Sequence, residues 1–223
     1  MRFYLALLLL ALTLLAGCGP DHGQLYEASI RQAAVRTPAA VVALQPLPAG
    51  ETVTVGSFTE WGVPASPLAR FTWVSVPSQL RALCRGKADA VLAIQQVLGL
   101  PPQPQPSRPD HRWQVITFQV PRASLFRPCP GGTDPDAAQC HPSQVPTEMD
   151  PEAMRFLLEQ MWSSWRSGFS GAPGYPFTGM GWSYNWDPEA VHPVGVSEYV
   201  LRRGTALTAV QVSTPAAFCN AAE

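Results

Sequence analysis

Twenty-four prolines are scattered through this chain of 223 residues, and they limit helices and strands to the segments between them. Proline lacks a backbone N–H group, so it interrupts helices and central strands. Because the prolines follow no period, they exclude a collagen-like chain and predict a globular fold with long loops. The stretch PPQPQPSRPDH at residues 101–111 is typical of such a loop.

Strands are expected in the first third, the middle and the end of the chain. Residues 51–61 show the alternation of a half-buried strand, and residues 113–120, WQVITFQV, are the strongest candidate. The other expected strands lie at residues 41–45, at residues 71–76, and on both sides of Arg203-Gly204 within residues 197–213.

The clearest helix begins at Asp150, which caps it ahead of Pro151 and Glu152. Its apolar residues form one broad stripe that needs a core to bury it; they are Met154, Leu157, Leu158, Met161, Trp162 and Trp165. Shorter helices are expected at residues 24–36, from Pro77 to Gly86, around Ile94 up to Gly99, and from Thr214 onward. Strands and helices do not alternate regularly, so residues 24–223 are predicted to form one α+β domain with a mostly antiparallel sheet and flanking helices.

The N-terminus has the pattern of an export signal. Met1 and Arg2 precede the apolar run Phe3–Leu15, in which Thr13 is the single polar residue. A helix that crosses a bilayer core of about 30 Å needs roughly 20 apolar residues, so this run is too short to span a membrane. It has the length of the apolar core of a signal peptide.

The end of this run, Leu15-Ala16-Gly17-Cys18, resembles the lipobox of bacterial lipoproteins. The resemblance implies cleavage after residue 17, a diacylglycerol on the thiol of Cys18, and a short tether at residues 18–23. The lipid bilayer would then be a partner, and acyl chains would hold the protein in the cell envelope. Gly19 lacks the aspartate that typically retains lipoproteins at the inner membrane, which favours the outer membrane where one exists. The alternative is an ordinary secretory signal with a chance cysteine.

Four further cysteines predict disulfides, since an even number in an exported chain favours a disulfide framework. Cys129 and Cys140 enclose the turn-rich segment PGGTDPDAAQ, which favours that pair and leaves Cys84 with Cys219. Four cysteines allow three pairings, so the other two remain open. A metal site formed by Cys129, Cys140 and His141 is a further alternative, but its spacing is unusual for metal ligands.

Several phrases of the mature chain resemble a group of uncharacterised exported bacterial proteins without an established activity. The phrases are WVSVPSQLRALCRG, IQQVLGLPP, LFRPCP, GYPFTGMGWSYNWDP and VGVSEYVLRRG. They run from about residue 71 to residue 204, and the cysteines that match are Cys84, Cys129 and Cys140. The resemblance implies a single fold adapted to export, fits the disulfide interpretation, and transfers no mechanism.

Charge and motif patterns exclude several classes of function. Charged residues make up 14% of the chain, and no basic patch suggests a nucleic-acid partner. The segment from Gly168 to Ala172 resembles the nucleophile elbow G-x-S-x-G, but its last glycine is replaced and it follows a helix rather than a strand. We therefore interpret it as a helix end that continues into a turn, and we expect no metal or cofactor.

Five polar residues remain as weak catalytic candidates. The histidines have no metal-binding pattern and are expected at the surface or at caps; they are His22, His111, His141 and His192. Glu198 is a charged residue within an apolar strand segment. It either faces solvent on the alternating side of the strand or is a buried catalytic carboxylate, and the sequence offers no partner for it.

The most distinctive stretch is aromatic. If residues 182–186 are extended, Trp182, Tyr184 and Trp186 lie on one side, because alternate residues of a strand face the same way. These rings either form part of the core or form an exposed platform that stacks on a glycan or a peptide.

The sequence as a whole predicts a non-catalytic envelope lipoprotein that binds a glycan or protein ligand. The alternatives are an exported hydrolase of envelope polymers and an effector or immunity-type protein partner.

Overall fold

The structure is a computed structural model that describes residues 20–130, 134–143, 150–169 and 174–222. Cys18 and the lipobox lie outside the described residues, as does most of the segment from Gly168 to Ala172. No helix within the described ranges is long and apolar enough to cross a membrane.

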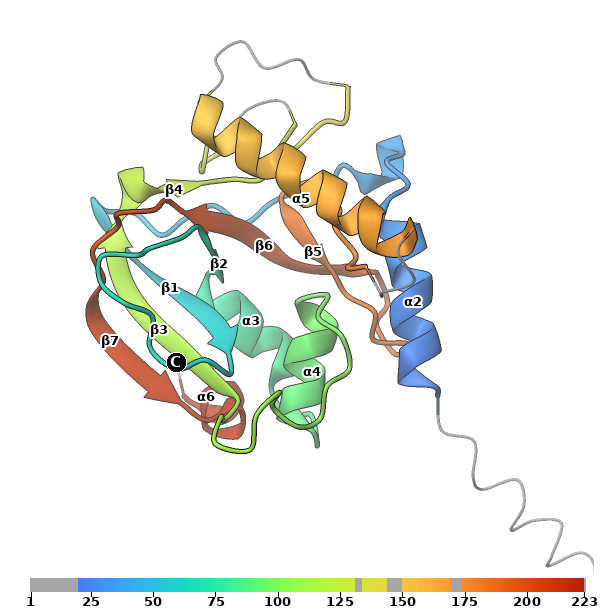
Figure 1. The fold of residues 1–223 in the computed structure, drawn as a ribbon, viewed down its shortest axis with the longest axis horizontal. Coiled ribbons are helices and arrows are strands. Elements are labelled where there is room, and N and C mark those ends of the chain that lie inside the picture. Colours follow the sequence, from blue (N-terminus) through green and yellow to red (C-terminus); the bar gives the residue numbers. More distant parts are fainter. Residues whose placement is uncertain (1–19, 131–133, 144–149, 170–173, 223) are drawn as a thin grey trace, which may run out of the picture.

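Seven antiparallel strands form the sheet, with the order β4-β6-β2-β1-β3-β7 and with β5 paired to β6 outside this path (Figure 1). The strands are β1 (Thr52–Thr59), β2 (Thr72–Ser75), β3 (Gln114–Pro121), β4 (Leu125–Phe126), β5 (Trp182–Tyr184), β6 (Val194–Leu201) and β7 (Thr208–Ser213). The single-domain α+β fold with an antiparallel sheet is thereby confirmed.

Most helices in the described residues begin at a side-chain cap, whereas α3 begins at a proline without one. The carboxylate of Asp150 accepts from the backbone N–H groups of Glu152 and Ala153, and Asp89 accepts from that of Leu92. The α-helices are α2 (His22–Ala33), α3 (Pro77–Cys84), α4 (Ala90–Val97), α5 (Pro151–Phe169) and α6 (Pro215–Asn220). Two short 3₁₀ turns, η1 and η2, lie at Pro38–Ala40 and Arg122–Ser124.

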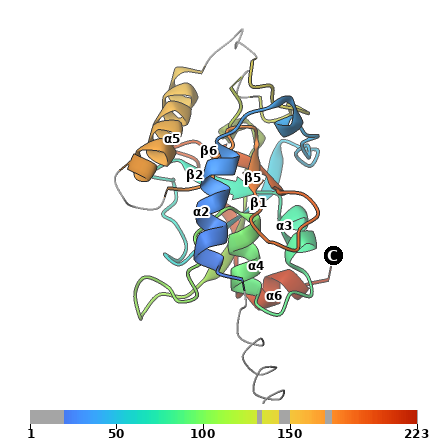
Figure 2. The same ribbon diagram turned by 90° about the vertical axis from the view of Figure 1, so that its right-hand side faces the viewer.

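Three helices cover part of one sheet face. Val115 of β3 and Val196 of β6 pack there against Leu80 of α3, Ile94 of α4 and Phe218 of α6. Figure 1 shows these three helices gathered together, while α5 crosses the sheet farther along β6. The helix α2 packs against β5, as the second view shows (Figure 2). One stretch of this sheet face therefore lies between the α3–α4–α6 group and α5.

The opposite face holds the largest apolar cluster. Val55, Phe118, Tyr199 and Leu201 from three strands are fully buried in it. Such burial contributes about 25 cal/mol for each Å² of apolar surface removed from water, so this cluster is a main source of stability.

Both disulfides join the expected cysteines. Cys84 at the end of α3 is bonded to Cys219 in α6, and Cys129 is bonded to Cys140. Each pair has a Cα–Cα distance of 5.4 Å, which is ordinary for a disulfide. Because Cys129 and Cys140 are bonded to each other, they do not form the alternative metal site.

Two local predictions are wrong. Residues 41–45 are not a strand, because the backbone N–H of Leu44 donates to the backbone oxygen of Ala138 in a loop, and that of Gln45 donates to a side chain, the hydroxyl of Ser197. The helix α2 begins at His22, within the predicted tether, because the side chain of Asp21 caps it.

Candidate functional site

The sheet opens between β1 and β2. β1 pairs along its whole length with β3, and β2 does so with β6, whereas β1 and β2 pair at Gly56 and Ser75 alone. The two halves of the sheet diverge from this contact, and a cleft of about 480 Å³ lies there. Sites for small molecules have volumes of about 300–1,000 Å³, so the cleft has the size of such a site.

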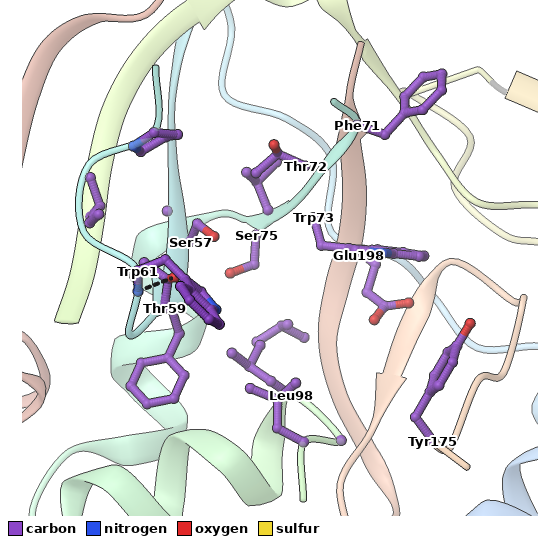
Figure 3. A pocket seen from close by; sticks show the side chains of 18 of the residues that line it. Ser57, Thr59, Trp61, Phe71, Thr72, Trp73, Ser75, Leu98, Tyr175 and Glu198 are labelled. Carbon is purple, nitrogen blue, oxygen red and sulfur yellow. Dashed lines mark hydrogen bonds between the residues drawn. The ribbon is translucent and has the colours of Figure 1, made fainter. Parts of the chain in front are cut away.

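The wall of the cleft is largely apolar and includes six aromatic residues (Figure 3). Its rings belong to Phe58, Trp61, Phe71, Trp73, Tyr175 and Phe177. Aliphatic hydroxyl groups come from Ser57, Thr59, Thr72 and Ser75, and Tyr175 adds a phenol hydroxyl. The only charged side chains among the lining residues are Arg70 and Glu198.

Trp61 forms the outer rim of the cleft, and 60% of its surface is exposed. Its backbone N–H donates to the hydroxyl of Thr59 at 3.1 Å. The ring of His111 meets its ring edge-on at 4.8 Å, and the guanidinium of Arg108 lies 5.9 Å from the ring centre. These contacts hold the indole at the entrance without burying it.

Glu198 lies at the floor of the cleft. It is directly opposite Ser75 across the β2–β6 pair, so the two side chains share one face of the sheet. Figure 3 shows the carboxylate pointing into the space between Trp73 and Tyr175. The residue is only partly exposed, and among the residues that the structure describes none forms a hydrogen bond or an ion pair with this carboxylate.

Burial raises the pKa of Glu198 to about 8, because the apolar surroundings disfavour the ionised form. Tyr175 faces it from the segment before β5, and its hydroxyl lies 2.7 Å from the backbone oxygen of Gln160 in α5. The pKa of Tyr175 is raised by burial and, to a lesser extent, by the charge of Glu198. The cleft therefore holds an unpaired carboxyl group that is mostly neutral at pH 7 when no ligand is bound.

We predict that Glu198→Gln stabilises the protein at alkaline pH. Between the ordinary pKa of 4.5 and the raised value of about 8, the folded state retains a proton that the unfolded state has lost, so stability falls as pH rises. Glutamine cannot ionise, so the variant should be more stable by roughly 4–5 kcal/mol at pH 9 and by no more than about 1 kcal/mol at pH 5.

Urea unfolding of both proteins across this pH range measures the effect. Glu27→Gln in α2, where the side chain is exposed, is the matched control and should show no such pH dependence. A constant difference between Glu198→Gln and the original protein from pH 5 to pH 9 would contradict the raised pKa of this carboxyl group.

Of the two alternatives for the rings at residues 182–186, the structure shows the core and not an exposed platform, because the rings are buried. Trp182, Tyr184 and Trp186 expose 5%, 8% and 4% of their surfaces. They pack against Tyr26 and Ala33 of α2, and the indole N–H of Trp182 donates to the backbone oxygen of Ala40. The N-terminal helix covers this side of β5, which the alternating pattern alone could not indicate.

The histidines lie outside the cleft. His22 packs against the ring of Trp186, and His111 contacts Trp61 from outside the lining. His141 and His192 are exposed in loops. Of the candidates predicted for chemistry, the structure brings Glu198 alone into the cleft.

Sequence reasoning missed most of the cleft wall. Trp73 and Ser75 alternate along β2 and so share the face of Glu198, which is a signal that the sequence contained. Trp61 had no such signal, because its position depends on a loop. The pairing of β1 with β2 joins segments that are apart in the sequence, so the pattern of residues within either strand does not indicate it.

The lining residues contain few groups of the kinds that enzymes use for catalysis. They include no histidine, cysteine or lysine, and Glu198 is their single carboxylate. Glycoside hydrolysis commonly uses two carboxyl groups, and a serine nucleophile needs an adjacent base that a third group orients. Comparison with protein-family models, curated proteins and solved structures finds no match for this chain.

Proposed function

We propose that this protein is a non-catalytic lipoprotein of the cell envelope that binds a small ligand in the cleft between β1 and β2. The observation that carries the proposal is the cleft itself, whose aromatic wall surrounds one unpaired carboxyl group. Pockets of this kind, mostly apolar with a few polar groups, are typical of small-molecule sites.

The lipid anchor is the second part of the proposal, and it rests on the lipobox at residues 15–18. We expect Cys18→Ser to abolish labelling by palmitate and to leave the protein unprocessed or released, because serine cannot form the thioether. Fractionation of cells after labelling measures both effects. Unchanged labelling of the variant would contradict the lipid anchor.

Ligand binding is tested with the mature protein, residues 18–223, with Cys18 replaced by serine, and a panel of small amphipathic compounds. Ligand-observed NMR should detect binders that Leu98→Trp displaces, because Leu98 points into the cleft and a larger ring there fills it (Figure 3). Leu83→Trp is the matched control, since Leu83 is exposed on α3 and does not line the cleft.

The proposal predicts that the control retains every binder that Leu98→Trp loses. It is contradicted if the panel yields no binder, or if the binders are unaffected by Leu98→Trp.

A further inference from the structure

The aromatic rings that line the cleft indicate which chemical class of ligand it can bind. An aromatic ring carries partial negative charge on its faces, so rings around a pocket attract a cation once water is excluded. The cleft brings together rings from the rim, from β2 and from the segment before β5, among them Trp61, Trp73 and Tyr175. Such a wall suits an ion that is both apolar and positively charged.

The single carboxyl group at the floor supplies the matching charge. Glu198 has no partner among the described residues, and no lysine or histidine lines the cleft. A buried carboxylate without a partner is unfavourable, whereas one that meets a cation gains a charge-assisted contact. A ligand with a positive charge would therefore satisfy the one polar group that the fold leaves unpaired at this position.

Arg70 is the one positively charged side chain among the lining residues, while Arg108 and Arg203 lie against the rings of Trp61 and Phe71. Arg70 precedes β2 and is exposed, so solvent screens it from a ligand at the floor. An anionic ligand that reached the floor would instead meet Glu198 and the faces of the aromatic rings. A neutral sugar would find five hydroxyl side chains, one of them the phenol of Tyr175, and the single carboxyl group, which is a sparse polar lining for its many hydroxyls.

On the basis of the proposed function, we propose that the cleft binds an organic ammonium ion, with its alkyl groups against the aromatic wall and its charge against the carboxylate of Glu198. The volume of about 480 Å³ admits a small amine rather than a folded polymer.

Binding of such an ion is coupled to release of a proton. Glu198 is mostly protonated in the empty cleft at pH 7, because burial raises its pKa to about 8. The titratable groups that face it are the hydroxyl of Tyr175 and, at the mouth, Arg70, while β2 and the end of α4 present Ser75, Trp73 and Leu98. A bound cation favours the ionised carboxylate, so affinity should rise with pH and level off above about pH 8.

Isothermal titration calorimetry with choline tests the proposal, with 3,3-dimethylbutan-1-ol as the neutral compound of the same shape. At pH 8.5 we expect choline to bind at least about tenfold more tightly than the alcohol. Titrations in buffers of different ionisation enthalpy should show proton release at pH 7. Glu198→Gln should weaken choline binding by about tenfold and abolish proton release, whereas Glu27→Gln should change neither.

Equal affinities for choline and the alcohol, or choline binding that Glu198→Gln leaves unchanged, would overturn the ammonium site. Neutral or anionic compounds would then remain as ligands, and binders displaced by Leu98→Trp would still support the proposed function. If no compound of any charge is displaced by Leu98→Trp, the proposed function fails as well.

Discussion

Gly195→Ala should lower the free energy of unfolding by about 3–5 kcal/mol, because β6 has no room for a side-chain carbon at this position. A Cβ atom there would overlap the backbone oxygen of Val97 and the hydroxyl of Ser183. That hydroxyl donates to Val97 at 2.6 Å and accepts from the backbone N–H of Val196 at 2.9 Å, so it joins α4, β5 and β6. The added methyl group must therefore push the Ser183 hydroxyl and the backbone of Val97 away and break these hydrogen bonds.

Gly56→Ala is the matched control for this experiment. Gly56 is also a buried strand glycine, but the nearest atom to its added Cβ would be 3.6 Å away, which is ordinary contact. We expect its cost to be about 1 kcal/mol or less. Denaturant unfolding of both variants measures the difference, and equal losses would contradict the packing described around Gly195.

Trp182→Ala should cost about 3–5 kcal/mol of stability, because the ring is buried beneath α2 and its N–H bonds to Ala40. Trp61→Ala should change stability by no more than about 0.5 kcal/mol, since most of that ring is exposed. The same variant should weaken the binding of cleft ligands, because Trp61 forms the rim.

Comparison of the Trp182→Ala and Trp61→Ala variants therefore distinguishes a residue of the core from a residue of the ligand site. Thermal melting of both variants, together with NMR binding measurements on Trp61→Ala, provides the test. A stable Trp182→Ala protein, or a Trp61→Ala protein that binds as before, would contradict these assignments.

The sequence predicted those parts of the fold that depend on local chemistry. Asp150 and Pro151 located the start of α5, and the alternation of residues 51–61 located β1. The turn-rich segment between Cys129 and Cys140 favoured the bridge that the structure contains. Each of these predictions used residues that are close together in the chain.

The cleft depends on contacts between distant segments, and these could not be predicted. Alternation correctly placed Trp182, Tyr184 and Trp186 on one side, but burial of that side required α2 to pack over it. Glu198 had a signal, as a charge within an apolar strand, yet its surroundings depend on how β1 and β2 diverge. That divergence arises from pairing with β3 and β6 rather than from β1 or β2 alone.

The most direct test of the cleft as a ligand site is a crystal structure of the mature protein soaked with the tightest binder from the panel. We predict electron density for the compound between β1 and β2, in contact with Trp61 or Trp73 and within hydrogen-bond distance of the Glu198 carboxylate. Density for the compound elsewhere on the protein, with the cleft closed by its own side chains, would contradict the account.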